Sequence, residues 1–469
     1  MDVPSKSDGM NSAPVSLGLK RQLLFSLGQF GWSLSLFSVA NLLTYFYLPP
    51  KLEAGEALFP PYIYQGAILG GLTLIGLIGF GGRLFDAVTD PLLANLSDRS
   101  KSPFGRRRLF LAIGALPSCI FGFLVFFPPS AGAGFFNSAF LVVAILLFYF
   151  FISMYCTPYN ALICEYGHTA LERLNLATLV SVTWALGFAI GNQVYLFQAM
   201  VQDAFPSLGA TGALQVVLGG FQFIAFLAMI APIFINERKH ARVATCDEPL
   251  LKSIKATFKN RNFVTFLIFD FTYFVSLTFI QLGISYYIMV LLGMEKAMVS
   301  FLMLLLFLLS FVFYVPVNFL ARKIGKRPVL LAAFLLFALD FLVVFFLGDM
   351  PFSKTVQAYL VVLLGSIPIA IFGILPTAVI ADVAETDERE TGVSRVGMYF
   401  ATRTFLMKAA ISVANLLFPS LLLLGRGGES VLGIRLSALV AVVFCITGLF
   451  FCLRYKDRPS SAEMIPGTS

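Results

Sequence analysis

The sequence predicts an all-α protein that crosses the membrane about twelve times, in two homologous bundles of six helices. Of the 469 residues, 58% are hydrophobic and only 12% are charged, whereas a soluble protein carries about 25% charged residues. Long apolar stretches recur along the whole chain, without the alternation that is typical of a membrane barrel. Because lipid satisfies no backbone hydrogen bond, these stretches are expected to form helices.

The expected helices follow one another from the first apolar stretch to the last. A spanning helix needs about 20 mostly apolar residues. Stretches of this kind cover residues 22–48, 63–97, 109–128, 136–163, 175–201, 214–236, 262–292, 297–321, 328–348, 355–383, 396–424 and 431–453. The predicted domains are a tail (1–21), a first bundle (22–236), a linker (237–261), a second bundle (262–453) and a tail (454–469).

The linker divides the chain near its middle. Its second half has apolar residues on one side of a basic helix, at Leu250, Leu251, Ile254 and Phe258. A helix of this kind is expected to lie along the inner membrane surface and to tether the two bundles.

Lys and Arg residues indicate the orientation, because cytoplasmic loops carry an excess of them. Most of the 33 lie in segments on one side, including both tails, the linker and the turn at 106–108. The opposite side holds Lys51, Lys296, Lys354, Arg426 and Arg435. Both termini are therefore predicted to be cytoplasmic, in the plasma (inner) membrane.

The two bundles share features at nearly constant spacing, which favours an internal duplication. A basic turn follows the second and the eighth span, and a proline precedes an acid in the fourth and the tenth. The pairs are Gly105–Arg108 with Gly325–Arg327, Pro158 with Pro376, and Glu165 with Asp382. Duplicated bundles of this kind hold their substrate between the halves, near mid-membrane.

Composition and motifs exclude several classes. The net charge of +8 reflects the loop topology, so no nucleic acid partner is expected. The six cysteines lie in spans or on the cytoplasmic side, which predicts no disulfide framework. His168 and His240 have no ligand spacing to a cysteine, and no GK[ST] loop is present. We therefore expect no metal beyond a coupling cation, no other cofactor, no direct use of ATP and no enzyme activity.

The second span carries ionisable groups on one face. At about 100° per residue, Arg83, Asp86 and Asp90 fall within roughly 60° of one another. Charged groups inside spans are costly unless they face a cavity or a partner. Paired carboxylates suit Na⁺, which prefers oxygen ligands, and they also suit a proton. The alternative is a permanent ion pair that holds helices together.

The eleventh span contains Lys408, with no acid nearby in sequence. An intramembrane ammonium needs a partner from another helix, and Asp86 and Asp90 in the opposite half are the expected ones. A lysine that competes with a cation for these carboxylates would couple the two. The other acids in spans, Asp270 and Asp340, are expected either to be paired or to lie near a water-filled crevice.

These motifs together resemble those of the glycoside–pentoside–hexuronide cation symporters of the major facilitator superfamily. The matching segments are Arg83–Pro91, Ser97–Arg99, Gly105–Arg108, Pro158–Leu162, Leu375–Pro376, Ala381–Asp382, Glu390–Gly392, Gly397–Met398 and Lys408. The resemblance covers nearly the whole chain, and sodium-dependent lysophospholipid symporters look like relatives of the same pattern. It implies the major facilitator fold of two six-helix bundles.

The resemblance also implies roles for individual residues. Asp86 and Asp90 would be cation ligands, with Thr89 and Ser153 as auxiliary oxygen ligands, and Lys408 would lie close to both the cation and the substrate. Departures occur where the family's sugar permease has polar groups: this chain has Ser33, Cys156 and Asn160 in place of two acids and a stacking tryptophan. The galactoside site is therefore not preserved.

Further candidates come from the remaining polar and aromatic residues. Trp32 and Trp184 are expected to line the substrate cavity, where an aromatic face stacks on a sugar ring or an acyl chain. The basic turns are expected to pair with acids at the cytoplasmic face and to latch the closed state. The residues of this predicted gate are Asp98, Arg106, Arg107, Glu165 and Asp382.

The predicted function is Na⁺- or H⁺-coupled symport of a small organic solute, a sugar or glycoside first, by a monomer surrounded by lipid. The alternative within transport is a lysophospholipid or another amphiphile. From other classes, a sensor that has lost transport would not need Asp86, Asp90 and Lys408. A membrane-embedded transferase would need a polar catalytic loop, and none is visible.

Overall fold

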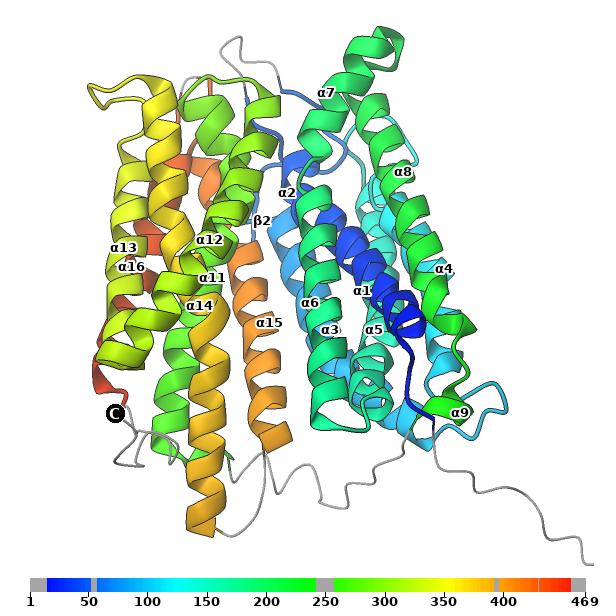
Figure 1. The fold of residues 1–469 in the computed structure, drawn as a ribbon. Helices are drawn as coiled ribbons and strands as arrows, with labels where there is room; N and C mark the ends of the chain where they lie inside the picture. Colours follow the sequence, from blue (N-terminus) through cyan, green and yellow to red (C-terminus); the bar gives the residue numbers. More distant parts are fainter. Residues whose placement is uncertain (1–14, 52–56, 242–256, 392–395, 429, 457–469) are drawn as a thin grey trace, which may run out of the picture.

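The fold is two groups of helices that stand side by side (Figure 1). In this computed structural model, the described residues are 15–51, 57–241, 257–391, 396–428 and 430–456. The first group consists of α1 (Leu19–Ala40), α2 (Leu42–Tyr47), α3 (Leu74–Arg99), α4 (Arg108–Leu124), α5 (Phe135–Tyr166), α6 (Ala170–Gly191), α7 (Val194–Ala204), α8 (Gly209–Ile230) and α9 (Glu237–His240). The second consists of α11 (Arg261–Tyr286), α12 (Lys296–Ile324), α13 (Lys326–Phe345), α14 (Lys354–Thr391), α15 (Val396–Leu421) and α16 (Leu432–Arg454).

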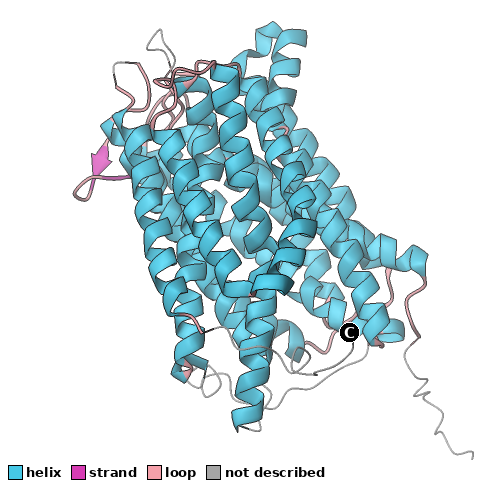
Figure 2. Cartoon of the chain, turned by 60° about the vertical axis from the view of Figure 1, so that its left-hand side comes forward, coloured by secondary structure: helices cyan, strands magenta, loops and turns pink. Residues whose placement is uncertain are grey.

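Short segments join or extend these helices. A hairpin of β1 (Ala67–Ile68) and β2 (Leu72–Thr73) precedes α3 and projects at one end of the molecule (Figure 2). A π turn (Tyr287–Leu291) prolongs α11, and 3₁₀ turns cover Pro206–Leu208, Ala231–Phe234 and Leu422–Leu424. Ten helical segments of the described chain are long and apolar enough to cross a membrane, and α4 is a shorter apolar helix. With the charge-bearing α3, they make up the predicted twelve spans.

Three predicted spans differ from the helices. The second begins at Leu74 rather than at residue 63, because the hairpin turns at Gly70 and Gly71, whose φ angles of 78° and 114° suit glycine. The Thr73 hydroxyl then caps α3 by accepting from the Gly76 N–H. The first span is interrupted at Asn41, and the fifth is divided into α6 and α7.

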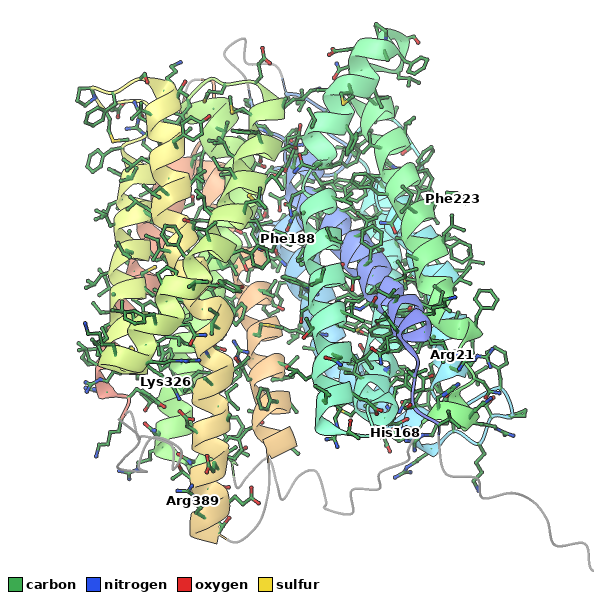
Figure 3. The ribbon with its side chains drawn as sticks, in the orientation of Figure 1. Arg21, His168, Phe188, Phe223, Lys326 and Arg389 are labelled. Carbon is green, nitrogen blue, oxygen red and sulfur yellow. The ribbon has the colours of Figure 1, made fainter. Side chains whose placement is uncertain are left out.

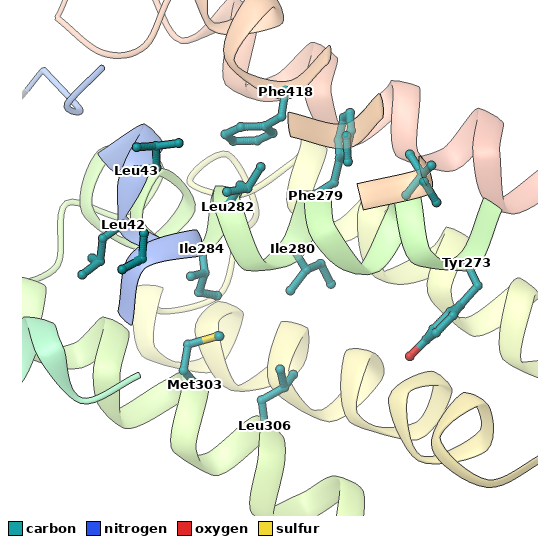
Figure 4. Close-up of a cluster of buried hydrophobic side chains, with 14 of the residues drawn as sticks. Leu42, Leu43, Tyr273, Phe279, Ile280, Leu282, Ile284, Met303, Leu306 and Phe418 are labelled. Carbon is teal, nitrogen blue, oxygen red and sulfur yellow. The ribbon is translucent and has the colours of Figure 1, made fainter. Parts of the chain in front are cut away.

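Apolar side chains divide between the interior and the rim. Phe223 on α8 is 62% exposed, and Val315 and Phe319 on α12 are 76% and 67% exposed. Figure 3 shows Phe223 directed away from the helices. Such large exposed apolar side chains are the surface that lipid would cover. Inside, Leu42 and Leu43 of the first half share one cluster with Ile284, Met303 and Phe418 of the second (Figure 4).

The start of α1 and the end of α16 lie at the same end of the molecule, together with α9 (Figure 1). This end also holds Arg21, His168, Lys326 and Arg389 (Figure 3). The arrangement agrees with two tails on one membrane face. The predicted linker, 237–261, begins with α9. Its predicted amphipathic helix lies largely outside the described residues, which lack 242–256 with Leu250, Leu251 and Ile254; Phe258 is described and is 47% exposed.

Candidate functional site

The predicted carboxylates and lysine meet across the two halves. The Lys408 Nζ on α15 lies 2.5 Å from Asp90 Oδ2 and 2.9 Å from Asp86 Oδ2 on α3. The Arg83 guanidinium donates to Asp86 Oδ2 at 3.0 Å. These four residues, named here the charge cluster, contain two carboxylates and two cations. The cluster is therefore formally neutral.

Small residues on α3 allow α15 to approach this closely. A Cβ at Gly76 would lie 2.9 Å from the Leu416 carbonyl oxygen, and one at Gly79 would lie 3.2 Å from the Asn415 side chain. Close contact of helix backbones at small residues is typical of membrane bundles. The glycines of the sequence before Arg83 thus bring Lys408 within reach of both acids.

The cluster is buried unevenly. Asp86 is 2% exposed, whereas the Asp90 side chain is 23% exposed. Asp86 accepts from Arg83, Lys408 and also the Ser153 hydroxyl of α5. Breaking a buried ion pair by removal of one partner costs about 3–5 kcal/mol, because it leaves a charge uncompensated. A cation that replaced Lys408 would keep the buried carboxylates compensated. Asp90 is the more accessible of the two carboxylates.

A stripe along α5 faces the cluster at helical spacing. The Arg83 guanidinium lies 5.2 Å from the centre of the Tyr149 ring, one turn before Ser153. One turn after Ser153, the Thr157 hydroxyl donates to Asp90 Oδ1 at 3.0 Å. Sequence reasoning missed Thr157; its position four residues after Ser153 was the available signal. Cys156 lies beside it, with its thiol 3.9 Å from the Ser153 carbonyl oxygen.

Thr89, which the resemblance implied as an oxygen ligand, has another partner in this conformation. Its hydroxyl donates to the Asp86 main-chain carbonyl at 3.1 Å, within α3. Thr157, rather than Thr89, therefore supplies the second hydroxyl at the carboxylates. Together, the oxygen donors at the cluster are two carboxylates and the Ser153 and Thr157 hydroxyls, a set suited to Na⁺ or to a proton. Within the described ranges, no group of three or more His, Cys, Asp or Glu residues could hold a metal ion.

The predicted substrate residues do not lie together. Ser33 is fully buried against α6, where a Cβ at Gly187 would lie 2.0 Å from its hydroxyl oxygen, and it donates to the Phe30 carbonyl. Helix packing therefore encloses Ser33 in this conformation, and its role in substrate binding stays a prediction. Asn160 is exposed, one turn beyond Cys156 on α5. Cys156 and Asn160 thus follow one another by one turn on α5, whereas Ser33 lies apart from them.

The two tryptophans have different surroundings. Trp32 packs on the apolar core, and its indole N–H is buried without a hydrogen-bond partner among the described residues. Trp184 belongs to an aromatic group in which Phe188 of α6 stacks on Phe307 of α12, with ring centres 4.4 Å apart. The second tryptophan thus lies where the two halves meet.

The predicted cytoplasmic gate residues form ion pairs, but each pair lies within one half. Arg107 contacts Asp98 at 2.7 Å and Glu165 at 2.9 Å, and Arg106 also pairs with Glu165. In the second half, Lys326 pairs with Asp382. These contacts repeat the duplication seen in the sequence. They stabilise the turns of each bundle, and the predicted role of these pairs in latching the closed state stays a prediction.

At the opposite end, polar contacts do join the halves. Ser300 of α12 donates to the Asn192 carbonyl at 3.0 Å and accepts from the Leu196 N–H at 3.1 Å. Tyr286 of α11 donates to the Leu48 carbonyl at 2.5 Å. Ser300 thus satisfies backbone groups that the interruption between α6 and α7 leaves free. These contacts, named here the outer seam, close that end of the molecule.

A duplicated bundle of spanning helices, with a buried charge cluster that joins its two halves, is typical of a secondary transporter. The chain belongs to the MFS/sugar transport protein family, whose sequence model matches residues 30–456. This confirms the resemblance to the glycoside–pentoside–hexuronide cation symporters and the major facilitator fold. The family consists of transporters and not of enzymes.

Individual relatives agree with the family. The chain is 22% identical to an isoprimeverose transporter of Lactiplantibacillus pentosus over 409 residues, which is 86% of this chain and 79% of the relative. It is 34% identical over 124 residues, 25% of this chain and 22% of the relative, to an Escherichia coli K12 protein assigned provisionally as the glycoside/cation symporter YagG. The solved nucleoside transporter NupG has the same fold, with a TM-score of 0.66, 16% identity, and coverage of 94% of this chain and all of NupG.

Proposed function

We propose that this transporter carries a sugar or a small glycoside together with Na⁺ or H⁺, and that the charge cluster is its cation site. The observation that carries the proposal is the position of Lys408, which one half inserts between two carboxylates of the other. The names of the relatives support a glycoside-type solute. The description of one relative as a glycoside/cation symporter supports coupling to a cation.

Competition between Lys408 and the cation accounts for the coupling. While Lys408 is bound to Asp86 and Asp90, it ties α15 to α3. A cation bound to the same oxygens would replace this ammonium and free α15 to move with the substrate. One charge that crosses ~100 mV supplies about 2.3 kcal/mol, which corresponds to roughly 40-fold accumulation of a neutral solute at 1.4 kcal/mol per tenfold.

A second candidate is an amphiphile, favoured by one observation. The group of Trp184, Phe188 and Phe307 bridges the halves and presents aromatic surface. An apolar chain would pack on these rings as well as a sugar ring would stack on them. A competition series of glycosides and lysolipids against labelled glycoside uptake separates the two substrate classes.

The test of the cation site is uptake by proteoliposomes under an imposed Na⁺ or pH gradient. Asp90→Asn removes one carboxylate that Lys408 and the cation share, so gradient-driven accumulation is expected to fall to the level of protein-free vesicles. Asp98→Asn is the matched control, because Asp98 pairs with Arg107 outside the cluster and its side chain is 51% exposed. Normal cation-driven accumulation by Asp90→Asn would refute the proposed site.

A further inference from the structure

The second half contains a carboxyl group that the proposed mechanism does not use. Asp340 on α13 is completely buried, and neither of its carboxyl oxygens has a hydrogen-bond partner among the described residues. Asp270, the other acid inside this half, is 2% exposed and receives two bonds from Arg403, at 2.8 and 3.2 Å. Both acids are therefore buried, but only Asp270 has a positively charged partner among the described residues.

The neighbours of Asp340 offer no positive charge. On α14, a Cβ at Gly365 would lie 3.0 Å from Asp340 Oδ2 and 3.3 Å from Leu306 of α12. The titratable groups in electrostatic range are Tyr287, at the end of α11, and Cys445 on α16. Among the described residues, no Lys, Arg or His side chain forms a hydrogen bond to either carboxyl oxygen. Tyrosine and cysteine are themselves neutral near pH 7 in their usual state.

An ionised carboxylate in such surroundings would be strongly destabilised, so the group takes up a proton instead. A sodium ion would need several oxygen ligands, whereas no oxygen of the described residues lies within hydrogen-bonding geometry of the carboxyl group. From this geometry we infer that Asp340 is a second cation site, specific for a proton and separate from the charge cluster. The proton is bound in the packed conformation that the structure shows.

Release of the proton requires water to reach the carboxyl, and α14 is the helix positioned to admit it. Gly365 leaves the carboxyl covered by backbone, without a side chain between them. Three residues later, Pro368 deprives the Leu364 carbonyl of its helical N–H partner and creates a point where α14 bends. The same helix extends to Asp382 at the predicted cytoplasmic end. Movement of α14 during alternating access would therefore expose Asp340 and discharge its proton.

Two polar pairs close to Asp340 can accommodate the ionised form. The Tyr287 and Ser437 hydroxyls lie 3.4 Å apart, and the Cys445 thiol lies 3.4 Å from the Ser276 hydroxyl. The Ser437 and Ser276 hydroxyls already donate to main-chain carbonyls of their own helices. The Tyr287 contact is long for an O–H···O hydrogen bond, so the Tyr287 hydroxyl is a donor available to a carboxylate after a side-chain rotation. The surroundings of Asp340 thus suit the protonated acid in the conformation shown, and they can offer a hydrogen-bond donor to the carboxylate in another conformation.

The test is difference infrared spectroscopy of the purified full chain in liposomes over a pH series, with no substrate added. The carbonyl band of a protonated carboxylic acid is expected to disappear as the pH rises, and Asp340→Asn is expected to lack this band. Asp270→Asn is the matched control, because its ion-paired carboxylate contributes no such band. A titrating band that persists in Asp340→Asn, or a band that never titrates while the protein is folded, would overturn the inference.

A second variant keeps the acid but changes its environment. Gly365→Ala places a methyl group about 3.0 Å from Asp340 Oδ2, so the midpoint of the band's titration should shift; an unchanged midpoint would contradict the assignment. This variant keeps the test valid if Asp340→Asn does not fold. In transport, Asp340→Asn should flatten the pH profile but retain stimulation by the cluster's cation. Because the infrared measurement needs no transport, its outcome is independent of the proposed symport.

Discussion

At the scale of single residues, the charge cluster decides which oxygen atoms meet a cation. The Ser153 hydroxyl, which the family resemblance implied as an oxygen ligand, donates to Asp86, and the structure adds Thr157 at Asp90. Thr89 instead donates within its own helix. The two threonines therefore differ in their partners, because Thr89 donates to a main-chain carbonyl of α3 and Thr157 donates from α5 to a carboxylate of the cluster.

The roles of the two threonines are testable. Thr157→Val removes a hydroxyl that donates to Asp90, and hydrogen bonds to charged groups contribute about 1.5–3 kcal/mol. The cation concentration for half-maximal uptake should therefore change by tenfold or more on a scale of about 1.4 kcal/mol per tenfold. Thr89→Val, the matched control, should change it less than twofold. Equal effects of the two substitutions would contradict the assignment of Thr157.

At the scale of elements, the break between α6 and α7 forms part of the outer seam. Gly191 ends one helix and Val194 begins the next, so backbone groups between them need other partners. Ser300 supplies both a donor and an acceptor from the opposite half. The interruption thus frees backbone groups for a contact with Ser300, and this contact can form or break as the halves move.

The seam predicts a conformational effect of Ser300→Ala. The substitution leaves the Asn192 carbonyl and the Leu196 N–H without their partner in the closed seam, at a cost of about 1–3 kcal/mol. The equilibrium should therefore shift about tenfold toward the state open at that end. The measurement is the rate at which an impermeant thiol reagent labels Ser285→Cys, a buried position beneath the seam, in a cysteine-free background.

Ser310→Ala is the matched control for the seam. Ser310 also lies buried on α12, but its hydroxyl donates to the Phe307 carbonyl of the same helix at 2.7 Å. Its loss should leave the labelling rate unchanged. If Ser300→Ala labels no faster than Ser310→Ala, the seam does not hold the closed state.

At the scale of the whole molecule, the two halves repeat the same turn. Arg106 pairs with Glu165 and Lys326 pairs with Asp382, each joining the start of one helix to the end of another. Gly105 and Gly325 precede these bases with φ angles of 123° and 89°, which glycine adopts readily. The duplication detected in the sequence therefore corresponds to equivalent structural roles, although no contact crosses between these two turns in the pairs described.

Orientation in the membrane is a prediction at this same scale. In a cysteine-free background, a single cysteine in place of Gly134 should react with an impermeant reagent added outside sealed cells. A single cysteine at Lys101, in the basic turn after α3, should react only after the membrane is opened. Both positions are exposed, so accessibility within the protein is matched. The opposite pattern would reverse the predicted topology.

The sequence alone determined the fold class, the number of spans and the charged residues that matter, because hydropathy and the cost of charge in lipid act on local stretches of chain. The ends of spans were less accurate, since the hairpin before α3 and the break at Asn192 depend on turns and on partners from other helices. The charge of Lys408 and its lack of a local acid already pointed to Asp86 and Asp90 as its partners. Only the tertiary structure decided that Arg403 pairs with Asp270 and that Asp340 has no partner among the described residues. Pairing depends on distances between helices that are far apart in sequence, and no local pattern contains that information.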